Sequence, residues 1–329
     1  MSKSVIICEK INNFKKTIEV AGDKSLSIRW ALMASLALGK SRAYNILNSE
    51  DVNNAILSLK KLGIKIKKTN NFCEINSKGL NSFSYKNNTI INAGNSGTFA
   101  RLIMGVLSNC DKQIVIKGDK SLSGRDFERV IKPLNLFGVK INSKNNKLPL
   151  KLKGTKFLRP INYYEKKGSA QVKSCILFAA LNTNGQTVLK CKKSRDHTEK
   201  LFKSLNLPIK VIKRKKFDII KIFGKKQFKG FDYKIPGDIS SAAFFIALTI
   251  LADKSSLKMK NVNYNKSRIG IIEILKKMRA KIKVTNIKNY KGEKVADISV
   301  TSSKNLIGIN CPKSLNTKSI DEFLTIFLV

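Results

Sequence analysis

Gly22-Asp23-Lys24-Ser25, followed directly by the apolar stretch LSIRWALMASLAL at 26–38, decides the fold of this chain, because the same device returns three times. Each copy is a glycine-led cluster of small polar residues that runs into an apolar stretch of helical length. The later copies begin at Gly94, Gly168 and Gly237, with gaps of 72, 74 and 69 residues. Self-similarity at a fixed period is typical of repeat architectures.

A second marker runs in step with the first. It consists of a β-branched residue, a lysine and another β-branched residue, and it occurs at 64–66, 139–141, 209–211 and 282–284. Its lysines lie 75, 70 and 73 residues apart. Because two independent markers share one period, we predict four complete structural repeats between residue 22 and about residue 300.

Each repeat alternates strand-like and helix-like segments. Strands are predicted at TIINAG (89–94) and QIVIKG (113–118), and the β-Lys-β marker itself has the pattern of a strand. Amphipathic helices are predicted at 52–63, 127–138, 197–206 and 269–278. This alternation predicts an α/β fold.

The repeated helix starts favour anionic ligands, because a helix start carries unpaired N–H groups and a positive dipole end. The first start is the richest, with Lys24, Ser25 and Arg29, and an arginine offers a fork to a carboxylate or phosphate. The near-duplicate GDKSLSGR at 118–125 puts Arg125 in an equivalent setting. An ordinary cap with a solvated lysine and arginine is the alternative interpretation of each.

Other motifs are weaker. The P-loop pattern is absent, and GNSGT at 94–98 lacks the spacing of a dinucleotide site. The lone histidine, His197, begins an amphipathic helix and is expected on the surface. Asp321-Glu322 opens a fifth apolar helix, which by the period points to the same place as Lys24. It is a candidate base, with a helix-dipole partner as the alternative.

Composition indicates a globular protein. The chain is 42% apolar but has no apolar run of 18 residues, so no membrane span is expected. The apolar run in MSKSVIICEKINN is too short for a secretory signal. Six cysteines without a CxxC pair are typical of reduced thiols in a cytoplasm, and neither zinc nor redox use is expected.

The net charge of +42 allows two interpretations. A lysine-rich surface binds polyanions through counterion release. Alternatively, the charge reflects a residue bias spread over a solvated surface, which we favour because clusters such as KRKK at 213–216 are short and no aromatic–basic interleaving accompanies them. In either case the field concentrates anionic metabolites.

The fifth repeat begins at 319–322 and the printed chain stops within the apolar helix FLTIFLV. The apolar face of such a helix would have no further element of the chain to pack against. We therefore expect the sequence to be incomplete at its C-terminal side.

Six segments together resemble the 5-enolpyruvylshikimate-3-phosphate synthase family, also called 3-phosphoshikimate 1-carboxyvinyltransferases. They are GDKSLSIRWALMASLALG, AGNSGTFARLIMGVL, GDKSLSGR, GSAQVKSCILFAALNTNG, SRDHTEK and PGDISSAAFFI. The resemblance implies an enolpyruvyl transferase architecture of βαβαββ units, an inside-out α/β barrel in two domains, here without its last repeats. It implies one domain at 20–235 and a truncated second domain of 1–19 with 236–329.

The resemblance also implies a reaction. The family moves the enolpyruvyl group of phosphoenolpyruvate onto the 5-hydroxyl of shikimate 3-phosphate and releases phosphate, with no metal or organic cofactor. Because both substrates are anions, charge and positioning supply much of the catalysis. A cytoplasmic monomer with these two small-molecule partners is implied, without a specific nucleic acid or membrane partner.

Site residues follow by matching motifs. The shikimate-3-phosphate contacts implied by the resemblance are Lys24, Ser25, Arg29, Ser169, Ala170, Gln171, Arg195 and Asp321. The implied phosphoenolpyruvate contacts are Lys24, Gly97, Arg125 and Gln171. Asp321 is the implied base for the 5-hydroxyl proton and Lys24 the second catalytic residue. Because Gly97 has no side chain, the wall of the implied phosphoenolpyruvate site lacks a methyl group there, as in family members that are sensitive to the inhibitor glyphosate.

Two departures from the family pattern matter. The family usually has Arg-Pro-Met where this chain has Arg125-Asp126-Phe127, and the acidic side chain is expected to weaken the field of Arg125. The family's segment beyond Val329 carries a Lys-Glu-Ser-Asp-Arg stretch, further arginines and a late lysine. Without them, residues 1–329 are expected to be inactive alone.

Three alternatives remain at this point. The sibling enolpyruvyl transferase acting on UDP-N-acetylglucosamine uses a cysteine on a loop of the second repeat, but GDKSLSGR has none and Cys110 lies outside it. A basic nucleic-acid-binding protein has only the net charge in its favour. The only observation in favour of a non-catalytic relic is that the sequence stops within an apolar helix.

Overall fold

The computed structural model describes residue 9 and residues 11–329. Cys8 and most of the segment interpreted above as lacking a secretory signal lie outside the described residues. The described chain divides into two compact units, Gly22–Ile235 and Pro236–Val329, the second including the described residues before Gly22.

The unit Gly22–Ile235 contains three four-stranded sheets with one common strand order. The first is β13 (Asp232–Lys234), β2 (Leu38–Tyr44), β4 (Phe72–Lys78) and β3 (Lys65–Lys68). The second is β5 (Thr89–Asn92), β6 (Ile114–Lys117), β8 (Leu150–Lys153) and β7 (Lys140–Ser143). The third is β9 (Asn162–Glu165), β10 (Gln186–Lys192), β12 (Phe217–Phe223) and β11 (Ile209–Lys213).

Strand directions repeat as well. In each sheet the first pair is parallel, as in β5 with β6, and the other two pairs are antiparallel. A parallel pair needs a crossover, and in the second and third sheets the apolar helix that lies between the two strands in the chain supplies it. The first sheet takes its outer strand from far along the chain, since β13 pairs with β2 with Asp232 opposite Arg42.

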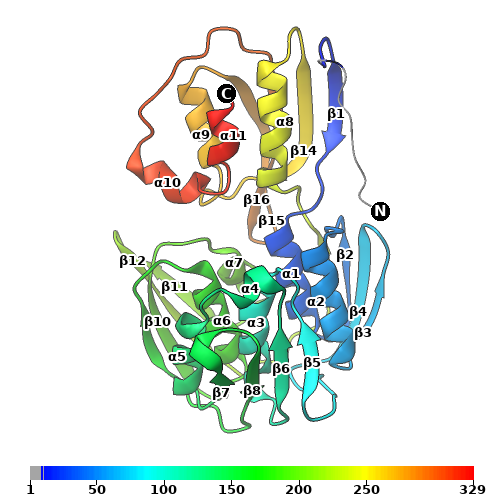
Figure 1. The fold of residues 1–329 in the computed structure, drawn as a ribbon, viewed down its shortest axis with the longest axis vertical. Helices are drawn as coiled ribbons and strands as arrows, with labels where there is room; N and C mark the ends of the chain where they lie inside the picture. The colour runs from blue at the N-terminus through cyan, green and yellow to red at the C-terminus, as the bar shows by residue number, and fades with distance from the viewer. Residues whose placement is uncertain (1–8, 10) are drawn as a thin grey trace. The chain divides into compact units, whose positions relative to one another are not determined.

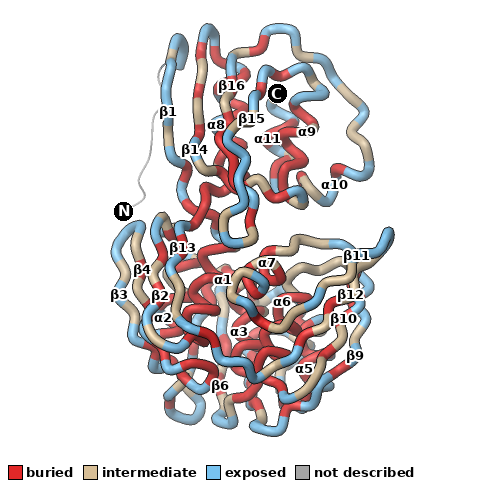
Figure 2. The backbone as a smooth tube through the Cα atoms, turned by 180° about the vertical axis from the view of Figure 1, so that it is seen from behind, coloured by how far each residue is buried: buried red, intermediate tan, exposed pale blue. Residues whose placement is uncertain are grey.

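The helices of this unit fall into two kinds. The crossover helices α1 (Lys24–Ala34), α3 (Gly97–Val106) and α6 (Ala170–Leu181) are buried on nearly every side (Figure 2). The amphipathic helices α2 (Glu50–Lys61), α5 (Glu128–Leu136) and α7 (His197–Ser204) bury mainly one face. A short helix, α4 (Lys120–Ser123), and the 3-10 turns Leu107–Asn109 and Lys144–Asn146 complete the unit.

The crossover helices form the centre of the unit, with α3 packed on both α1 and α6. The contact between α3 and α6 depends on one glycine. A Cβ atom on Gly105 would lie 2.1 Å from the carbonyl oxygen of Cys175, far inside van der Waals contact. Only a residue without a side chain lets the two backbones approach this closely.

The second unit contains one sheet of the same pattern. Its strands are β1 (Lys15–Glu19), β14 (Ser256–Asn263), β16 (Glu293–Thr301) and β15 (Lys281–Tyr290). Its helices are α8 (Ile239–Leu251), α9 (Gly270–Lys277), α10 (Lys313–Ser319) and α11 (Phe323–Phe327), of which α8, α9 and α11 lie beside the sheet in Figure 1. Here β1 takes the outer position and pairs in parallel with β14, as β13 does with β2.

The apolar helices of this unit are more exposed than their counterparts. On α8, the side chains of Phe244, Phe245, Leu248 and Leu251 reach solvent, Phe244 with 66% of its surface. On the short helix α11, Leu324 is 82% and Phe327 is 76% exposed. The same helix position is therefore fully enclosed in the first unit and open on one side in the second.

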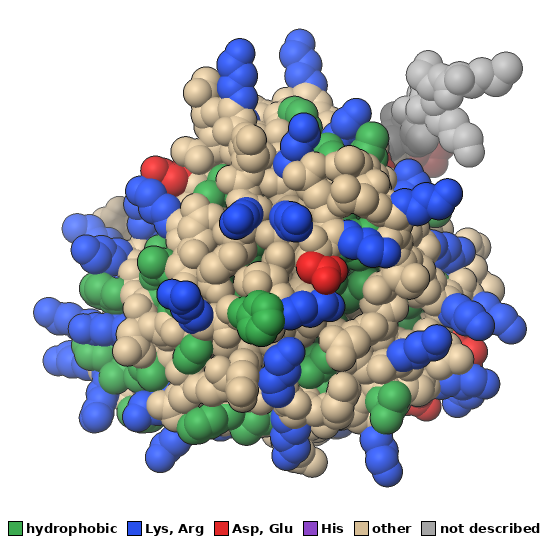
Figure 3. Space-filling view, turned by 90° about the horizontal axis from the view of Figure 1, so that it is seen from below, with side chains coloured by type: hydrophobic (Ala, Val, Ile, Leu, Met, Phe, Trp, Pro, Cys, Tyr) green, Lys and Arg blue, Asp and Glu red, His purple; other side chains and the backbone are tan. Residues whose placement is uncertain are grey.

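The structure confirms the predicted helices and strands. Each β-Lys-β marker lies in or beside a strand, in β3, β7, β11 and β15, and the four amphipathic segments form α2, α5, α7 and α9. On the face drawn in Figure 3, lysine and arginine side chains are scattered rather than gathered into one patch. In the described part of the chain no helix has the length and hydropathy needed to cross a membrane.

Candidate functional site

The four repeated helix starts share one capping device. A side-chain oxygen of the residue before each helix accepts a backbone N–H of its first turn, and the capping residues are Asp23, Ser96, Ser169 and Asp238. The cap fixes the direction of the start, and the other N–H groups of the first turn have no partner within the helix. These starts are suited to bind anions.

At the start of α1, Asp23 is fully buried and its carboxylate accepts the N–H of Leu26 at 2.9 Å. The next residue, Lys24, places its ammonium 3.2 Å from the carboxylate of Asp51 on α2, while half of its side chain stays in solvent. An exposed pair of this kind is weak. The pair therefore keeps the Lys24 ammonium near the helix start, and little free energy is needed to turn the ammonium toward an anionic ligand.

Arg29 is buried, with 3% of its surface exposed, and it joins three helices. Its Nε donates to the hydroxyl of Thr198 on α7 at 2.9 Å, and its Nη2 donates to the hydroxyl of Ser174 on α6 at 3.2 Å. Those two hydroxyls are themselves 2.8 Å apart. A third bond runs from Nη1 to the carbonyl oxygen of Ser25, one turn back. Arg29 thus ties the first repeat to the third.

Gly97, the first residue of α3, lies against two arginines. A Cβ atom there would be 2.8 Å from Nη1 of Arg101 and 3.2 Å from Nη1 of Arg125. The Arg125 guanidinium donates to the side-chain oxygen of Asn95 at 2.8 Å. The structure therefore brings Gly97 and Arg125 together, as the two were grouped from the sequence, although they belong to different helix starts.

Asp126, the acidic residue next to Arg125, is held by the backbone of the following helix. Its carboxylate accepts the N–H of Glu128 at 2.7 Å, and its carbonyl oxygen accepts a bond from Arg101 at 3.1 Å. The contacts of Arg125 are instead with Asn95 and, at 3.4 Å, with the hydroxyl of Ser121.

Gln171, in the first turn of α6, connects the second and third repeats. Its amide nitrogen donates to the hydroxyl of Thr98 at 3.0 Å, and its amide oxygen accepts from Nη1 of Arg101 at 3.0 Å. Ser169, immediately before the helix, caps it through the N–H of Val172. Ser169, Ala170 and Gln171 are all partly exposed, so their polar groups are within reach of a ligand.

Arg101 is a further candidate site residue, which none of the sequence motifs singled out. It contacts Gly97, Gln171 and Asp126, and its guanidinium lies 4.7 Å from the ring centre of Phe127. Burial, together with the nearby positive charges of Arg129 and Arg125, lowers its pKa below the usual value. Arginine side chains stay protonated in proteins, so the guanidinium still carries its charge at neutral pH.

A sequence signal for Arg101 exists in the repeat itself. Arg29 and Arg101 each donate to the carbonyl oxygen four residues earlier, that of Ser25 in one case and Gly97 in the other. Both arginines lie seven residues after the glycine that opens their repeat, Gly22 in one case and Gly94 in the other. In the third repeat Ser174 likewise bonds the carbonyl oxygen four residues earlier, that of Ala170, at 2.7 Å.

The start of α7 differs from its prediction. His197 does begin the helix, but only 1% of it is exposed, so the expectation of a surface position is wrong. The reason is that the first turn is bonded to α6, where Glu199 pairs with Lys173 at 2.6 Å and the hydroxyl of Thr198 lies 2.8 Å from that of Ser174. Arg195 lies just before this turn and is partly exposed.

The Lys173–Glu199 pair is almost completely buried, with side-chain exposures of 1% and 6%. Burial by itself lowers the pKa of Lys173, but the charge of Glu199 and the hydrogen bond to it outweigh this effect, and the pKa lies above its usual value. The Lys173 ammonium is therefore charged at neutral pH, and its ion pair with Glu199 holds α6 and α7 together.

Asp321 belongs to the second unit, where it lies just before α11 with 45% of its side chain exposed. The buried guanidinium of Arg268 has three carboxylates around it, at 3.5 Å from Asp238, 3.9 Å from Glu322 and 4.0 Å from Asp321. Nη2 of Arg268 also donates to the hydroxyl of Ser240 at 2.6 Å. Arg268 thus anchors the segment that carries Asp321 to the start of α8.

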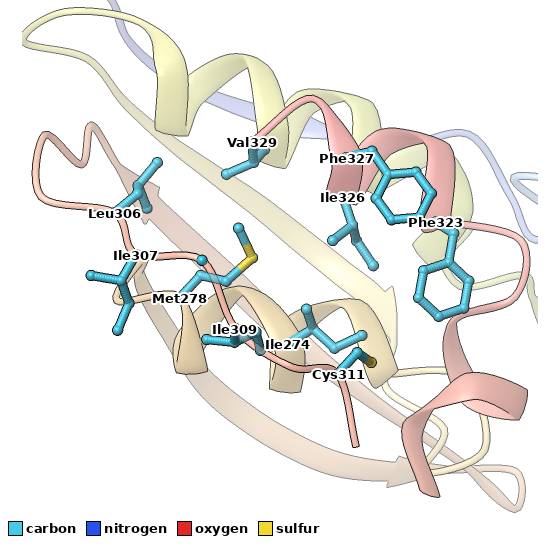
Figure 4. Close-up of a pocket in the computed structure, with 11 residues that line it drawn as sticks. Ile274, Met278, Leu306, Ile307, Ile309, Cys311, Phe323, Ile326, Phe327 and Val329 are labelled. Atoms are coloured by element: carbon cyan, nitrogen blue, oxygen red, sulfur yellow. The ribbon is translucent and has the colours of Figure 1, made fainter. Parts of the chain in front are cut away.

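A pocket of about 340 Å³ in the second unit is a different feature (Figure 4). Apolar side chains and Cys311 line it, from α9, residues 306–311 and the end of the chain, and they include Ile274, Met278, Phe323 and Phe327. None of the candidate site residues lines this pocket. It has no charged group with which to hold an anion.

Four of the described cysteines are unsuited to nucleophilic chemistry. Burial raises the pKa of the Cys73, Cys175 and Cys191 thiols to about 12 and that of Cys110 to about 11. A thiol with such a pKa is hardly ionised at neutral pH and is a poor nucleophile. Within the described residues, no group of three or more His, Cys, Asp or Glu side chains is placed to hold a metal ion.

Comparisons with known proteins identify the relatives of this chain. A family model described as EPSP synthase (3-phosphoshikimate 1-carboxyvinyltransferase) matches residues 8–328. The 3-phosphoshikimate 1-carboxyvinyltransferase of Ruthia magnifica is 40% identical over 329 residues, which are 100% of this chain and 74% of that protein. The enzyme of the same name from Endomicrobium trichonymphae is 39% identical, over 98% of this chain and 74% of its own length.

Among solved structures, the EPSP synthase of Acinetobacter baumannii superposes with a TM-score of 0.87 at 33% identity. The match covers 96% of this chain and 71% of that one. The α/β fold predicted from the repeats is thereby confirmed.

Proposed function

Because the chain belongs to the EPSP synthase (3-phosphoshikimate 1-carboxyvinyltransferase) family, we propose that its helix starts hold the two anionic substrates of this reaction. The reaction transfers the enolpyruvyl group of phosphoenolpyruvate to the 5-hydroxyl of shikimate 3-phosphate and releases phosphate. It is a step of aromatic amino acid biosynthesis.

Shikimate 3-phosphate is held by the starts of α1 and α6. Lys24 and Ser25 contribute from α1, Ser169, Ala170 and Gln171 from α6, and Arg195 from the segment before α7. Their ammonium, hydroxyl, amide and N–H groups are donors, which a phosphate accepts strongly. Arg29 contributes its charge and fixes the carbonyl end of Ser25, to which it is bonded.

Phosphoenolpyruvate is held beside Gly97. The Arg125 guanidinium offers it a fork, Lys24 and Gln171 contribute further donors, and the missing side chain of Gly97 leaves room for the ligand. We add Arg101 to this set, because it touches both Gly97 and Gln171.

Catalysis is a matter of charge and proton transfer. Asp321 takes the proton of the 5-hydroxyl as that oxygen forms its bond to the enolpyruvyl carbon. The positive groups around phosphoenolpyruvate stabilise the charge that develops and the phosphate that leaves. We further propose that the protein works as a cytoplasmic monomer, in keeping with the family's biosynthetic role.

One observation supports this proposal above the others: Gln171 of α6 is bonded both to Thr98 and to Arg101 of α3. Two helix starts from different repeats therefore share one set of donors, as a site for two anions requires.

The proposal is tested by calorimetric titration of residues 1–329 with shikimate 3-phosphate, with shikimate as the control that lacks the phosphate. We expect saturable one-to-one binding of the phosphate ester and at least about tenfold weaker binding of shikimate. Equal affinity for both compounds, or no binding of either, contradicts the proposed site.

A further inference from the structure

One buried carboxylate organises the turn that leads into α6. Glu165, the last residue of β9, is 4% exposed. Its Oε1 accepts the N–H of Lys167 at 3.0 Å, and its Oε2 accepts the N–H groups of Gly168 at 2.6 Å and Ser169 at 3.0 Å. Hydrogen bonds to an ionised acceptor are about twice as strong as neutral ones.

Three successive N–H groups that point to one place form a concavity that binds anions. In this turn the chain fills the concavity with its own carboxylate. The turn also needs Gly168, whose φ of +75° lies in the left-handed region. An external anion at this helix start therefore meets the groups that follow, namely the Ser169 hydroxyl and the first-turn N–H groups of Ala170 and Gln171.

We propose that Glu165 is a positioning residue for the shikimate-3-phosphate site. It does not touch the ligand. Its hydrogen bonds close the turn 166–169. They thereby fix the positions of the Ser169 hydroxyl and of the first turn of α6, which contact the phosphate. This inference rests on the function proposed above and adds a residue to it that none of the sequence motifs contains.

The direction of one mutational effect separates positioning from charge. A carboxylate close to an anion site repels the ligand, so if only the charge of Glu165 mattered, the isosteric change Glu165→Gln would tighten binding. Positioning predicts weaker binding, because the glutamine amide nitrogen is a donor and faces backbone donors, which leaves buried N–H groups unpaired.

The experiment is a calorimetric titration of shikimate 3-phosphate into the wild-type chain and into Glu165→Gln, Glu165→Asp and Glu128→Gln. The last is the matched control, since Glu128 makes an exposed ion pair with Lys132 in the same unit. We expect binding to Glu165→Gln to be at least about tenfold weaker, binding to Glu165→Asp to be intermediate because both oxygens remain, and the control to match wild type.

Two results overturn the inference: unchanged or tighter binding by Glu165→Gln, and unchanged hydrogen exchange at the amides of residues 167–169 in that variant. The exchange measurement needs no ligand. If Glu165→Gln does not fold, the same two measurements on Glu165→Asp decide. A wild-type chain that does not bind shikimate 3-phosphate contradicts the proposed function instead, so the two failures are told apart.

Discussion

The amide nitrogen of Gln171, at the start of α6, donates a hydrogen bond of 3.0 Å to the hydroxyl of Thr98, at the start of α3. The two residues lie 73 positions apart, which is one repeat. The contact exists because α3 packs directly on α6, with Gly105 at the crossing. A repeat that buries equivalent helices side by side also brings their polar starts together.

Gln171→Ala removes both the bond to Thr98 and the bond to Arg101. We expect the affinity for shikimate 3-phosphate to fall about tenfold, because the ligand loses one donor and Arg101 loses the group that orients it. Calorimetric titration measures the effect. Gln113→Ala, which changes an exposed glutamine bonded to Asn88, is the control. A loss no greater than in this control would remove Gln171 from the site.

Gly97→Ala places a methyl group 2.8 Å from Nη1 of Arg101 and 3.2 Å from Nη1 of Arg125. Both guanidinium groups must move, and the space for the ligand beside residue 97 becomes smaller. We expect the dissociation constant of glyphosate, measured with shikimate 3-phosphate present, to rise by more than about tenfold. In the control Gly308→Ala the new methyl group meets no atom within 4 Å. Equal constants for Gly97→Ala and wild type contradict the assignment.

Asp321→Asn keeps the shape of the side chain and removes its ability to accept a proton. Loss of a general base lowers the rate by about 10² to 10⁴-fold. Because residues 1–329 are expected to be inactive alone, turnover is measured in a chain extended with the C-terminal segment of a family member, where we expect a decrease of this size. Binding of shikimate 3-phosphate should change little, because most of its proposed contacts belong to the other unit. Asp111→Asn, at an exposed position, controls for the loss of charge. Turnover within about threefold of wild type means that another group is the base.

Lys173→Met leaves the carboxylate of Glu199 buried without its partner. We expect the free energy of unfolding, measured with urea, to fall by about 3–5 kcal/mol. Replacing both residues, with Lys173→Met and Glu199→Leu, should restore most of this loss, because no buried charge then remains. The control is Lys132→Met in the exposed pair with Glu128, where we expect no measurable loss of stability. A double variant as unstable as the single one contradicts the prediction.

The same pair predicts a pH dependence. The pKa of Lys173 in the folded chain lies above its usual value of 10.5, so its stabilising contribution is complete below that pH and is lost as the pH rises through the folded pKa. As the pH is raised from neutrality, the difference in unfolding free energy between wild type and the double variant should therefore begin to fall only above about pH 10.5. A difference that changes between pH 6 and 9 would mean that another group is responsible.

The sequence determined much of the fold, because the period of the two markers fixes the kind of element at each position. Glycine-led caps followed by apolar stretches became α1, α3, α6 and α8, and the β-Lys-β markers fell in or beside strands. Asp23, Ser96, Ser169 and Asp238 cap helices for a local reason that needs no tertiary contact, since each side chain reaches an N–H only two or three residues away.

The sequence could not give the partners of the site residues. His197 looked exposed because an amphipathic helix has a polar side, but its first turn faces α6, where Lys173 meets Glu199. The partner of Arg101 is Gln171 of α6, which lies 3.0 Å away in space but 70 residues along the chain. Glu165 lies at the end of a strand, and only the path of the turn shows that its carboxylate holds three N–H groups.

By itself, then, the order of residues specified the repeats, their helices and strands, and the donors at each helix start, because these depend on neighbours within a few positions. Which starts meet, which charges are buried and which groups orient the donors were decided by the packing of α3 on α1 and α6, since contacts between residues some seventy positions apart are made only when the helices are packed.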